Sequence, residues 1–148
     1  MTNKEKKQYL RRAYRINNLV RSHRAELEIY KAAIESIGGG NMDGQPHAPR
    51  HDGSTGEIKI IDKKIDLEAQ LRCEIADLKE QWREIHDTIN GVKDINERLV
   101  LRYKYIERRE WSDISTELNY SVERIYQIHR DALEHLTPPE TPQHYSKL

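Results

Sequence analysis

The sequence predicts an all-α protein in which a long, coiled-coil-like antiparallel helical hairpin precedes several shorter helices. Apolar residues recur every three or four positions over two long stretches, and strand-like alternation occurs nowhere in the 148 residues. Glycine and proline, which interrupt helices, concentrate between residues 38 and 56 and after residue 137. Charged residues make up 34% of the chain and apolar residues 36%, a balance that suits amphipathic helices with a thin core.

The first expected helix runs from about residue 3 to residue 37, a stretch without proline or glycine. Its charged residues separate apolar ones that recur at three, four or seven positions, although His23 falls within this stripe and Arg12 interrupts it. The stripe consists of Tyr9, Ile16, Leu19, Leu27, Tyr30, Ile34 and Ile37. The pattern predicts an amphipathic helix of roughly nine turns.

Residues 38–56 are expected to form a flexible loop, because they hold six of the seven glycines and almost nothing apolar. Two histidines and two aspartates in this loop raise the question of a metal site: Asp43, His47, His51 and Asp52. A tetrahedral site needs rigidly anchored ligands, so we expect no metal here. We expect no cofactor elsewhere, and no catalytic residues, because no nucleophile–base pair or phosphate-binding loop is present in the sequence.

From Glu57 the helical pattern resumes, and it ends near Asn90-Gly91, a plausible helix end and hinge. Steps of four and three separate its apolar positions, as in the core of a coiled coil. These positions are Leu71, Ile75, Leu78, Trp82, Ile85, Ile89 and Val92, with Ile61 and Ile65 upstream. Such a stripe needs a partner, and the first helix supplies one if residues 1–92 fold as an antiparallel hairpin. A parallel coil between two copies is the competing solution.

Residues 93–137 show three shorter helical patterns, and residues 138–148, with three prolines, are expected to form a flexible tail. Their inward positions are Leu99, Tyr103 and Ile106; then Trp111, Ile114 and Leu118; then Ile125, Ile128, Ala132 and Leu136. Ser121 is well placed to cap the last helix, and the small side chain of Ser115 permits a close crossing of the last two helices. A tight turn between two short helices predicts a helix-turn-helix.

The outward face of the last predicted helix carries side chains suited to reading DNA bases. Glu123 can accept a hydrogen bond from cytosine, Gln127 can bond adenine at two positions, and Arg124 and Arg130 can bond guanine or phosphate. Tyr126 lies near the edge of this face. An ordinary solvated helix face would have the same composition, so the prediction rests on the capped turn and the paired helices together.

Bulk charge does not favour nucleic acid, because the formal net charge of the chain is zero. Residues 94–136 carry seven Lys/Arg against nine Asp/Glu, a net charge of −2, whereas residues 1–37 carry nine against four, a net charge of +5. The basic start of the chain could touch DNA phosphates or a polymerase, or could be a solvated helix end. It consists of Lys4, Lys6, Lys7, Arg11, Arg12 and Arg15.

Three motifs in the last third resemble the promoter-reading C-terminal region, region 4, of sigma-70 family factors. They are Glu97-Arg98-Leu99-Val100-Leu101-Arg102-Tyr103, Glu110-Trp111-Ser112-Asp113-Ile114 and Leu118-Asn119-Tyr120-Ser121, continued by Arg124-Ile125-Tyr126-Gln127-Ile128-His129-Arg130-Asp131-Ala132-Leu133. The resemblance implies base and phosphate contacts by Val122, Glu123, Arg124, Tyr126 and Gln127. This sequence departs from the family at Val122 and Tyr126, where basic residues are common, and Glu110 replaces a capping Ser or Thr.

The candidate DNA-binding residues are therefore Ser121, Val122, Glu123, Arg124, Tyr126, Gln127 and Arg130. A helical N-terminal half joined to one sigma-like module also resembles RinA/ArpU-type phage regulators, which activate late operons. The resemblance implies promoter DNA and host RNA polymerase as partners. A dimer formed through the N-terminal helices is expected as well. A small-terminase-type DNA-packaging protein and a helical protein-interaction adaptor are the alternatives.

Several residues outside the DNA face carry structural expectations. The lone Cys73 lies beside the apolar stripe, where inert packing is expected, and a single cysteine fits a reducing cytoplasm. His129 and His135 are expected at the solvent edge of the last helix. No apolar run has the length of a membrane span, so neither a membrane nor a secretory signal is expected.

Overall fold

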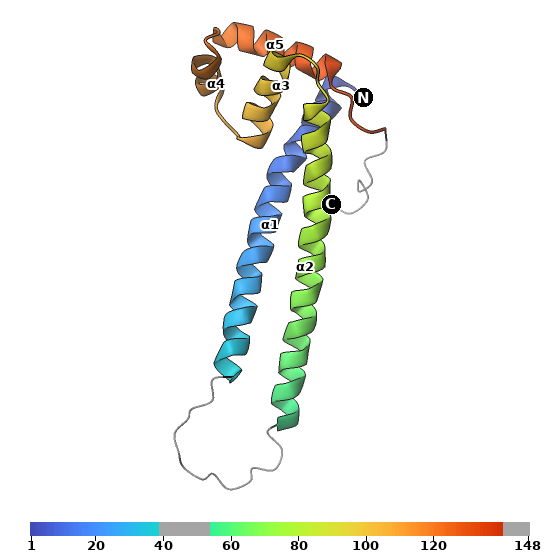
Figure 1. Cartoon of the computed structure of the whole chain (residues 1–148), viewed down its shortest axis with the longest axis vertical. Helices are drawn as coiled ribbons and strands as arrows, with labels where there is room; N and C mark the ends of the chain where they lie inside the picture. Colours follow the sequence, from blue (N-terminus) through green and yellow to red (C-terminus); the bar gives the residue numbers. More distant parts are fainter. Residues whose placement is uncertain (39–53, 141–148) are drawn as a thin grey trace. The chain divides into compact units, whose positions relative to one another are not determined.

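The computed structural model describes residues 1–38 and 54–140, and within them every regular element is helical (Figure 1). The elements are α1 (Asn3–Gly38), α2 (Ser54–Asn90), α3 (Ile95–Leu101), the π-helix η1 (Arg102–Ile106), α4 (Trp111–Leu118) and α5 (Val122–His135). The predicted all-α class is confirmed. The predicted flexible loop, residues 38–56, is wrong at its ends, because residue 38 belongs to α1 and residues 54–56 belong to α2. The rest of that loop, with the four candidate metal ligands weighed above, lies outside the described residues, as does most of the predicted tail.

The chain divides into two compact units. Unit 1 comprises Met1–Leu19 and Leu78–Leu148, and unit 2 comprises Val20–Asp77. The boundary predicted between residues 92 and 93 therefore falls inside unit 1, which joins the start of α1 and the end of α2 to the four C-terminal elements. None of the described helices is long and apolar enough to cross a membrane.

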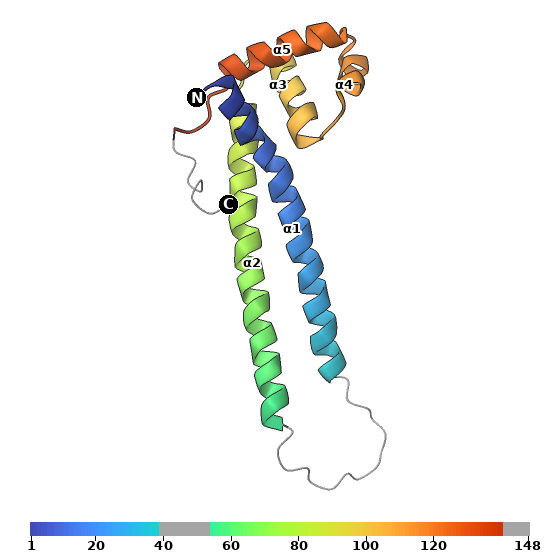
Figure 2. The ribbon, with the colours of Figure 1, turned by 180° about the vertical axis from the view of Figure 1, so that it is seen from behind.

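Within unit 1, α1 and α2 lie side by side and run in opposite directions (Figures 1 and 2). The hydroxyl of Tyr9 lies 3.0 Å from Glu84 Oε1 and 3.0 Å from Thr88 Oγ1. One turn further along α1, Arg12 donates to Gln81 Oε1 at 3.1 Å. As residue numbers rise on α1 they fall on α2, so the predicted antiparallel pairing within one chain is confirmed in this unit.

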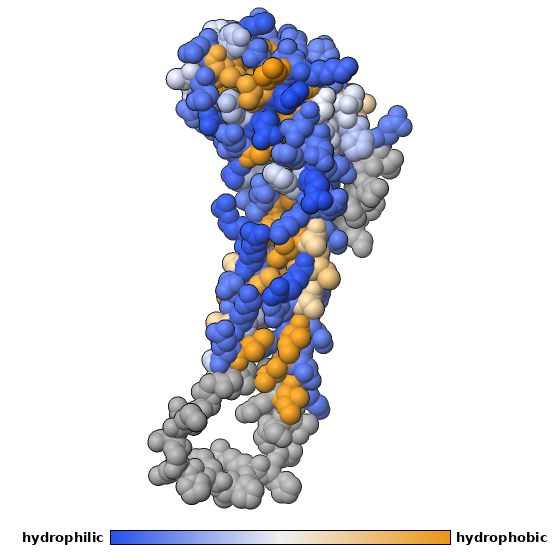
Figure 3. Space-filling model, in the orientation of Figure 1, coloured by the Kyte–Doolittle hydropathy of each residue, from blue (hydrophilic) through white to orange (hydrophobic). Residues whose placement is uncertain are grey.

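Unit 2 shows the same antiparallel pairing with fewer buried groups. Leu27 of α1 packs against Leu71 and Ile75 of α2. His23, the histidine of the predicted stripe, places its Nε2 atom 3.5 Å from Glu74. Hydrophobic side chains form a stripe along the paired helices and hydrophilic ones flank it (Figure 3). This intrachain pairing uses the apolar stripe that a parallel coil between two copies would need.

The buried face of α1 is wider than the predicted stripe at the start of the helix. Tyr9 and Ile16 are buried as expected, but Leu10 and Ala13 are fully buried too. Two neighbours account for the difference, because this part of α1 contacts α2 on one side and the C-terminal elements on the other. The heptad positions from Leu71 to Ile89 on α2, and Val92 just after this helix, are buried or half-buried.

Two side chains on α2 depart from their expected environments. Cys73 is exposed, so the expectation of inert packing beside the stripe is wrong. Its position follows Arg72 on the outward side of the helix, two residues before the buried Ile75. Ile65 is also largely exposed, although it extends the heptad pattern upstream.

Candidate nucleic-acid interface

The C-terminal elements share one apolar cluster that holds α5 in place. Its fully or nearly fully buried members are Val100, Ile114, Ile125 and Ile128, with Tyr103, Trp111 and Leu118 packed against them. Ala132 and Leu136 are buried further along the chain. The inward positions predicted for α4 and α5 are therefore confirmed, and the opposite face of α5 is left to solvent.

The segment before α4 differs from the single regular helix predicted for it. Leu99, Tyr103 and Ile106 are only half-buried, and the buried positions are instead Val100, Leu101 and Tyr105. Val100 packs against Ile114, Ile125 and Ile128, and Tyr105 meets His129, so contacts with α4 and α5 select this inward face. After Leu101 the chain continues with the wider turn of a π-helix, seen where Glu107 N donates to Arg102 O at 3.0 Å.

The turn between α4 and α5 is fixed by polar groups. Asn119 ends α4 in the left-handed region at φ 55°, and Tyr120 N donates to Ser115 O at 3.2 Å. Ser121 then caps α5 by accepting from Arg124 N at 3.2 Å, as predicted. Ser115, expected only to permit a close crossing, also donates its hydroxyl to the Tyr120 carbonyl. Glu110 precedes α4 without a side-chain capping bond.

Most of the candidate DNA-binding side chains lie together on the solvent side of α5. The exposed ones are Ser121, Glu123, Arg124, Tyr126, Gln127 and Arg130, and Val122 is half-buried. Arg124 donates to Gln127 Oε1 at 3.1 Å, so two of the expected base-reading groups are already linked one turn apart. Tyr126 meets Trp111 edge to face, with ring centroids 5.2 Å apart.

Two acidic residues on the same exposed side were not among the predicted site residues. Asp131 and Glu134 follow Arg130 in the second half of α5, and both are exposed. Their charges would face the phosphates of any duplex lying along the whole helix. The N-terminal half of α5, which carries Glu123, Arg124 and Gln127, is therefore the part suited to enter a groove.

His129 is not at the solvent edge, so that expectation is wrong. It is buried, and its Nε2 atom lies 2.9 Å from the Tyr105 hydroxyl in η1. Burial, reinforced by the nearby charges of Lys7 and Lys104, lowers the pKa of His129 to about 4. Burial likewise raises the pKa of Tyr105 to about 12. Both groups are thus neutral near pH 7, and the pair joins α5 to η1 without a buried charge.

The far end of α5 is anchored from two directions. Lys6 of α1 donates to Leu133 O at 2.7 Å and to Glu134 O at 3.3 Å, carbonyls that the helix end leaves without partners. The exposed His135 lies 2.8 Å from Glu97 in α3, and the hydrogen bond to this carboxylate raises the pKa of His135. The solvent-edge position expected for His135 is confirmed.

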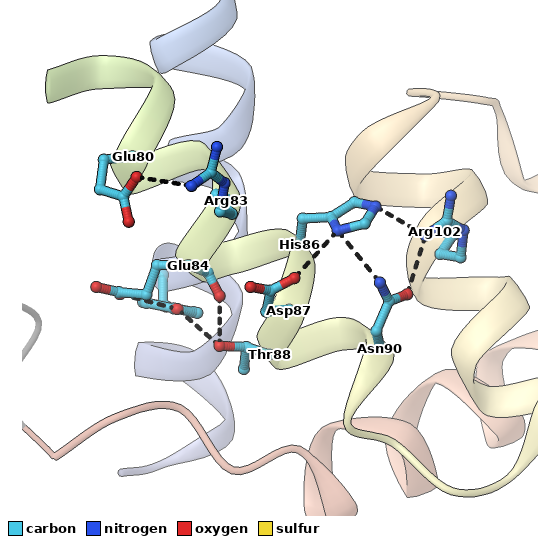
Figure 4. Close-up of polar contacts among 9 residues, drawn as sticks. Glu80, Arg83, Glu84, His86, Asp87, Thr88, Asn90 and Arg102 are labelled. Atoms are coloured by element: carbon cyan, nitrogen blue, oxygen red, sulfur yellow. Dashed lines mark hydrogen bonds and ion pairs between the residues drawn. The ribbon is translucent and has the colours of Figure 1, made fainter. Parts of the chain in front are cut away.

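The end of α2 is tied to η1 by a polar cluster (Figure 4). Arg102 donates to Asn90 Oδ1 at 3.0 Å and lies 3.2 Å from His86 Nε2. His86 in turn stacks on Trp82, with centroids 5.0 Å apart. Asn90 is the last residue of α2, as predicted. The predicted hinge at Asn90-Gly91 is bridged by the Arg102 side chain.

The fold and the exposed face of α5 define an all-α protein with a C-terminal helix-turn-helix. The chain belongs to the family described as protein of unknown function DUF1492, whose model matches residues 57–137. These residues run from the start of α2 through α5 and include the whole candidate interface. No curated protein and no solved structure matches the chain.

Proposed function

We infer that this protein is a sequence-specific DNA-binding transcriptional regulator that reads promoter DNA with the N-terminal half of α5. The observation that carries the proposal is the exposed set Glu123, Arg124 and Gln127 on a helix whose start, turn and far end are all fixed. A helix-turn-helix of this kind places its second helix in the major groove, where these side chains can bond base edges.

The rigidity of α5 supports base reading over a purely solvated surface. Its N-terminus is capped by Ser121, its middle is joined to η1 through His129, and its last carbonyls accept from Lys6. Side chains on a helix held at both ends can meet bases without first losing backbone freedom, which lowers the cost of specific binding.

The resemblance to sigma-70 region 4 and to RinA/ArpU-type regulators supplies the biological setting of the proposal. In that setting the protein activates a phage or prophage late operon together with the host RNA polymerase, in the cytoplasm of a bacterial cell. In that setting the polymerase would contact the part of the surface formed by the half-buried Leu99, Tyr103 and Ile106. A packaging protein and a protein-interaction adaptor are the competing functions.

Selection of binding sites from a randomised duplex library, with the purified full chain, tests the proposal directly. We expect a discrete motif, and Gln127→Ala should reduce discrimination at one base pair of it by about 1–3 kcal/mol. Arg124→Ala should weaken binding to all sequences and flatten the salt dependence if this guanidinium contacts phosphate. The matched controls are Gln70→Ala and Arg72→Ala, two exposed positions of unit 2.

The outcomes separate the three functions. A discrete motif and loss of discrimination in Gln127→Ala support the regulator. Salt-dependent binding without a motif, combined with a ring of many subunits by light scattering, supports DNA packaging. No salt-dependent DNA binding at all supports the adaptor. Unchanged binding by both α5 variants contradicts the assignment of the recognition helix.

A dimer is the expected binding species, because one helix-turn-helix of net acidic charge binds DNA weakly. Unit 2 supports this part of the proposal, since it presents Ile29, Ile58 and Ile65 to solvent at 67%, 55% and 49% exposure. Exposed isoleucines on a two-helix hairpin are suited to burial against a second copy.

A further inference from the structure

Four cations on α1 share one face of the helix within unit 1. Lys4, Lys7, Arg11 and Arg15 are separated by three, four and four residues, the spacing that aligns side chains along a helix. Lys4, Arg11 and Arg15 are exposed and Lys7 is half-buried. We call these four residues the α1 basic stripe. At about 1.5 Å per residue it extends over roughly 16 Å.

The α1 basic stripe is not neutralised by the protein. Among the described residues, none of its four members forms an ion pair with a carboxylate, whereas Arg109 contacts Glu107 at 2.8 Å and Glu117 at 3.5 Å. Residues 1–19 carry six Lys/Arg and one Asp/Glu, a net charge of +5. The fold joins this segment to the module of residues 94–136, whose net charge is −2.

The stripe runs beside the elements that hold the recognition helix. Lys6, its neighbour in sequence, donates to the Leu133 carbonyl at the end of α5. The charge of Lys7 contributes to the lowered pKa of His129 in the middle of that helix. The charge of Arg11 lowers the pKa of Tyr105 in η1, against the larger effect of burial, which raises it. One residue before Arg15, Tyr14 lies under the Arg108 guanidinium, 3.8 Å from its ring centroid.

Two further cations extend the surface on the side of η1. The charge of Lys104 also contributes to the lowered pKa of His129, and its ammonium lies 4.6 Å from the centroid of the Trp111 ring. Arg108 stacks on Tyr14. Neither forms an ion pair with a carboxylate among the residues described, and Lys104 donates to Arg109 O at 3.3 Å. Lys7, Arg11 and Lys104 thus lie near the buried His129–Tyr105 pair, and Arg108 lies against α1 at Tyr14.

We propose that the α1 basic stripe is a second DNA-binding surface, which contacts the phosphodiester backbone of the duplex that α5 reads. The inference rests on the proposed function, because it assigns to α1 the electrostatic part of the same DNA complex. The division of labour follows from charge: α5 carries two arginines against three acidic residues and reads bases, while α1 supplies the sequence-independent attraction.

A nucleic-acid partner fits this surface better than an acidic protein. The four cations are spread evenly over several turns, and the exposed ring between them, Tyr14, is already stacked with the Arg108 guanidinium, whereas specific protein interfaces bury an apolar core. An evenly charged ridge matches a strand whose phosphates repeat about every 3.4 Å of helix axis. Lysine and arginine can each contact one phosphate without reading sequence.

The test compares two quadruple variants of the full chain on the duplex selected by the parent protein and on a scrambled duplex. The first, K4Q/K7Q/R11Q/R15Q, removes the stripe and keeps good helix formers. The second, R21Q/R24Q/K59Q/K63Q, removes the same charge from exposed positions of unit 2. Circular dichroism and thermal unfolding establish that each variant remains folded.

We expect the stripe variant to bind both duplexes at least about tenfold more weakly at low salt, with the preference for the selected duplex unchanged. The slope of log affinity against log salt should flatten by up to about 3.6, since each lost phosphate contact removes about 0.9. The unit 2 control should keep the parent slope.

Four outcomes are decisive. If the parent binds the selected duplex but the stripe variant keeps its affinity and salt slope, the inference is wrong and the proposed function stands. The inference is wrong in the same way if that variant instead loses binding to purified RNA polymerase, which would assign the stripe to a protein. Equal weakening by the control variant also contradicts the inference, because net charge alone would then explain it. If the parent binds no DNA, the proposed function itself fails.

Discussion

Units 1 and 2 each contain part of α1 and part of α2, yet they bury the apolar residues of these helices to different degrees. In unit 1, Tyr9, Leu10, Ile85 and Ile89 are completely inaccessible to solvent. In unit 2, Leu27, Leu71 and Ile75 each keep 7% of their surface exposed. Three isoleucines of unit 2 are 49% to 67% exposed, and unit 1 has one such isoleucine, Ile95, at 68%. The difference reflects the number of neighbours, since unit 1 packs further helices against the hairpin and unit 2 has only the pair.

This contrast indicates a division between a self-sufficient unit and one suited to a partner. Two helices alone leave one side of each apolar stripe in contact with water, so they gain less from burial than a bundle does. Unit 1 also adds specific polar links, such as Lys6 to Leu133 and Arg102 to Asn90. These hydrogen bonds hold α5 and η1 in place, and α5 carries the candidate interface.

The largest expected effect comes from the same substitution made in each unit. Leu101→Ala, at a fully buried position of unit 1, should lower the free energy of unfolding by about 4 kcal/mol, and Leu71→Ala in unit 2 by about 2 kcal/mol. Both tryptophans lie in unit 1, so denaturant unfolding followed by fluorescence measures that unit, and amide hydrogen exchange measures unit 2. Equal costs would contradict the contrast in packing.

Acidification should destabilise unit 1 through His129. Its folded pKa of about 4 lies below the ordinary value of 6.5, so the unfolded chain binds a proton first. The stabilisation is complete above pH 6.5 and is lost as pH falls toward 4, by about 3 kcal/mol in total. Unfolding monitored by tryptophan fluorescence between pH 4 and 7 checks this. In His129→Gln the corresponding part of the pH dependence should disappear; a parent-like profile would assign it to other groups.

Removing the anchor at the end of α5 should have a smaller effect. Lys6→Met deletes the ammonium that bonds Leu133 O and should cost unit 1 about 1–2 kcal/mol. Lys4→Met, two residues earlier and exposed, should change stability by less than about 0.5 kcal/mol. Thermal unfolding of the two variants side by side provides the measurement. A similar loss in both would mean that the charge of α1, and not the bond to α5, stabilises the unit.

The smallest change in stability, and a change in assembly, is expected from the exposed isoleucines of unit 2. Replacing Ile29, Ile58 and Ile65 with glutamine should alter the free energy of unfolding of the isolated chain by about 0.5 kcal/mol or less per site. If the dimer forms through this hairpin, sedimentation should show the parent as a dimer and the variant as a monomer. A dimer that persists in the variant would place the interface elsewhere.

Much of the fold follows from sequence periodicity because helical burial is local and regular. The heptad pattern of α2, the inward positions of α4 and α5, the cap at Ser121 and the helix end at Asn90 all agree with the structure. The exposed face of α5 could be predicted for the same reason: once Ile125 and Ile128 face inward, Glu123, Arg124 and Gln127 must face out. These residues are placed by spacing alone.

Only the tertiary structure decided what depends on contacts between distant segments. Val100, Leu101 and Tyr105 are buried because other elements pack against them, whereas the periodic pattern predicted Leu99, Tyr103 and Ile106 for that face. His129 is buried because Tyr105 and Trp111 come to it, and Lys6 meets the end of α5 from 127 residues away in sequence. Sequence determines which face of each helix is apolar, but which helices meet, and which polar groups are carried inside, is set by the packing of all of them together.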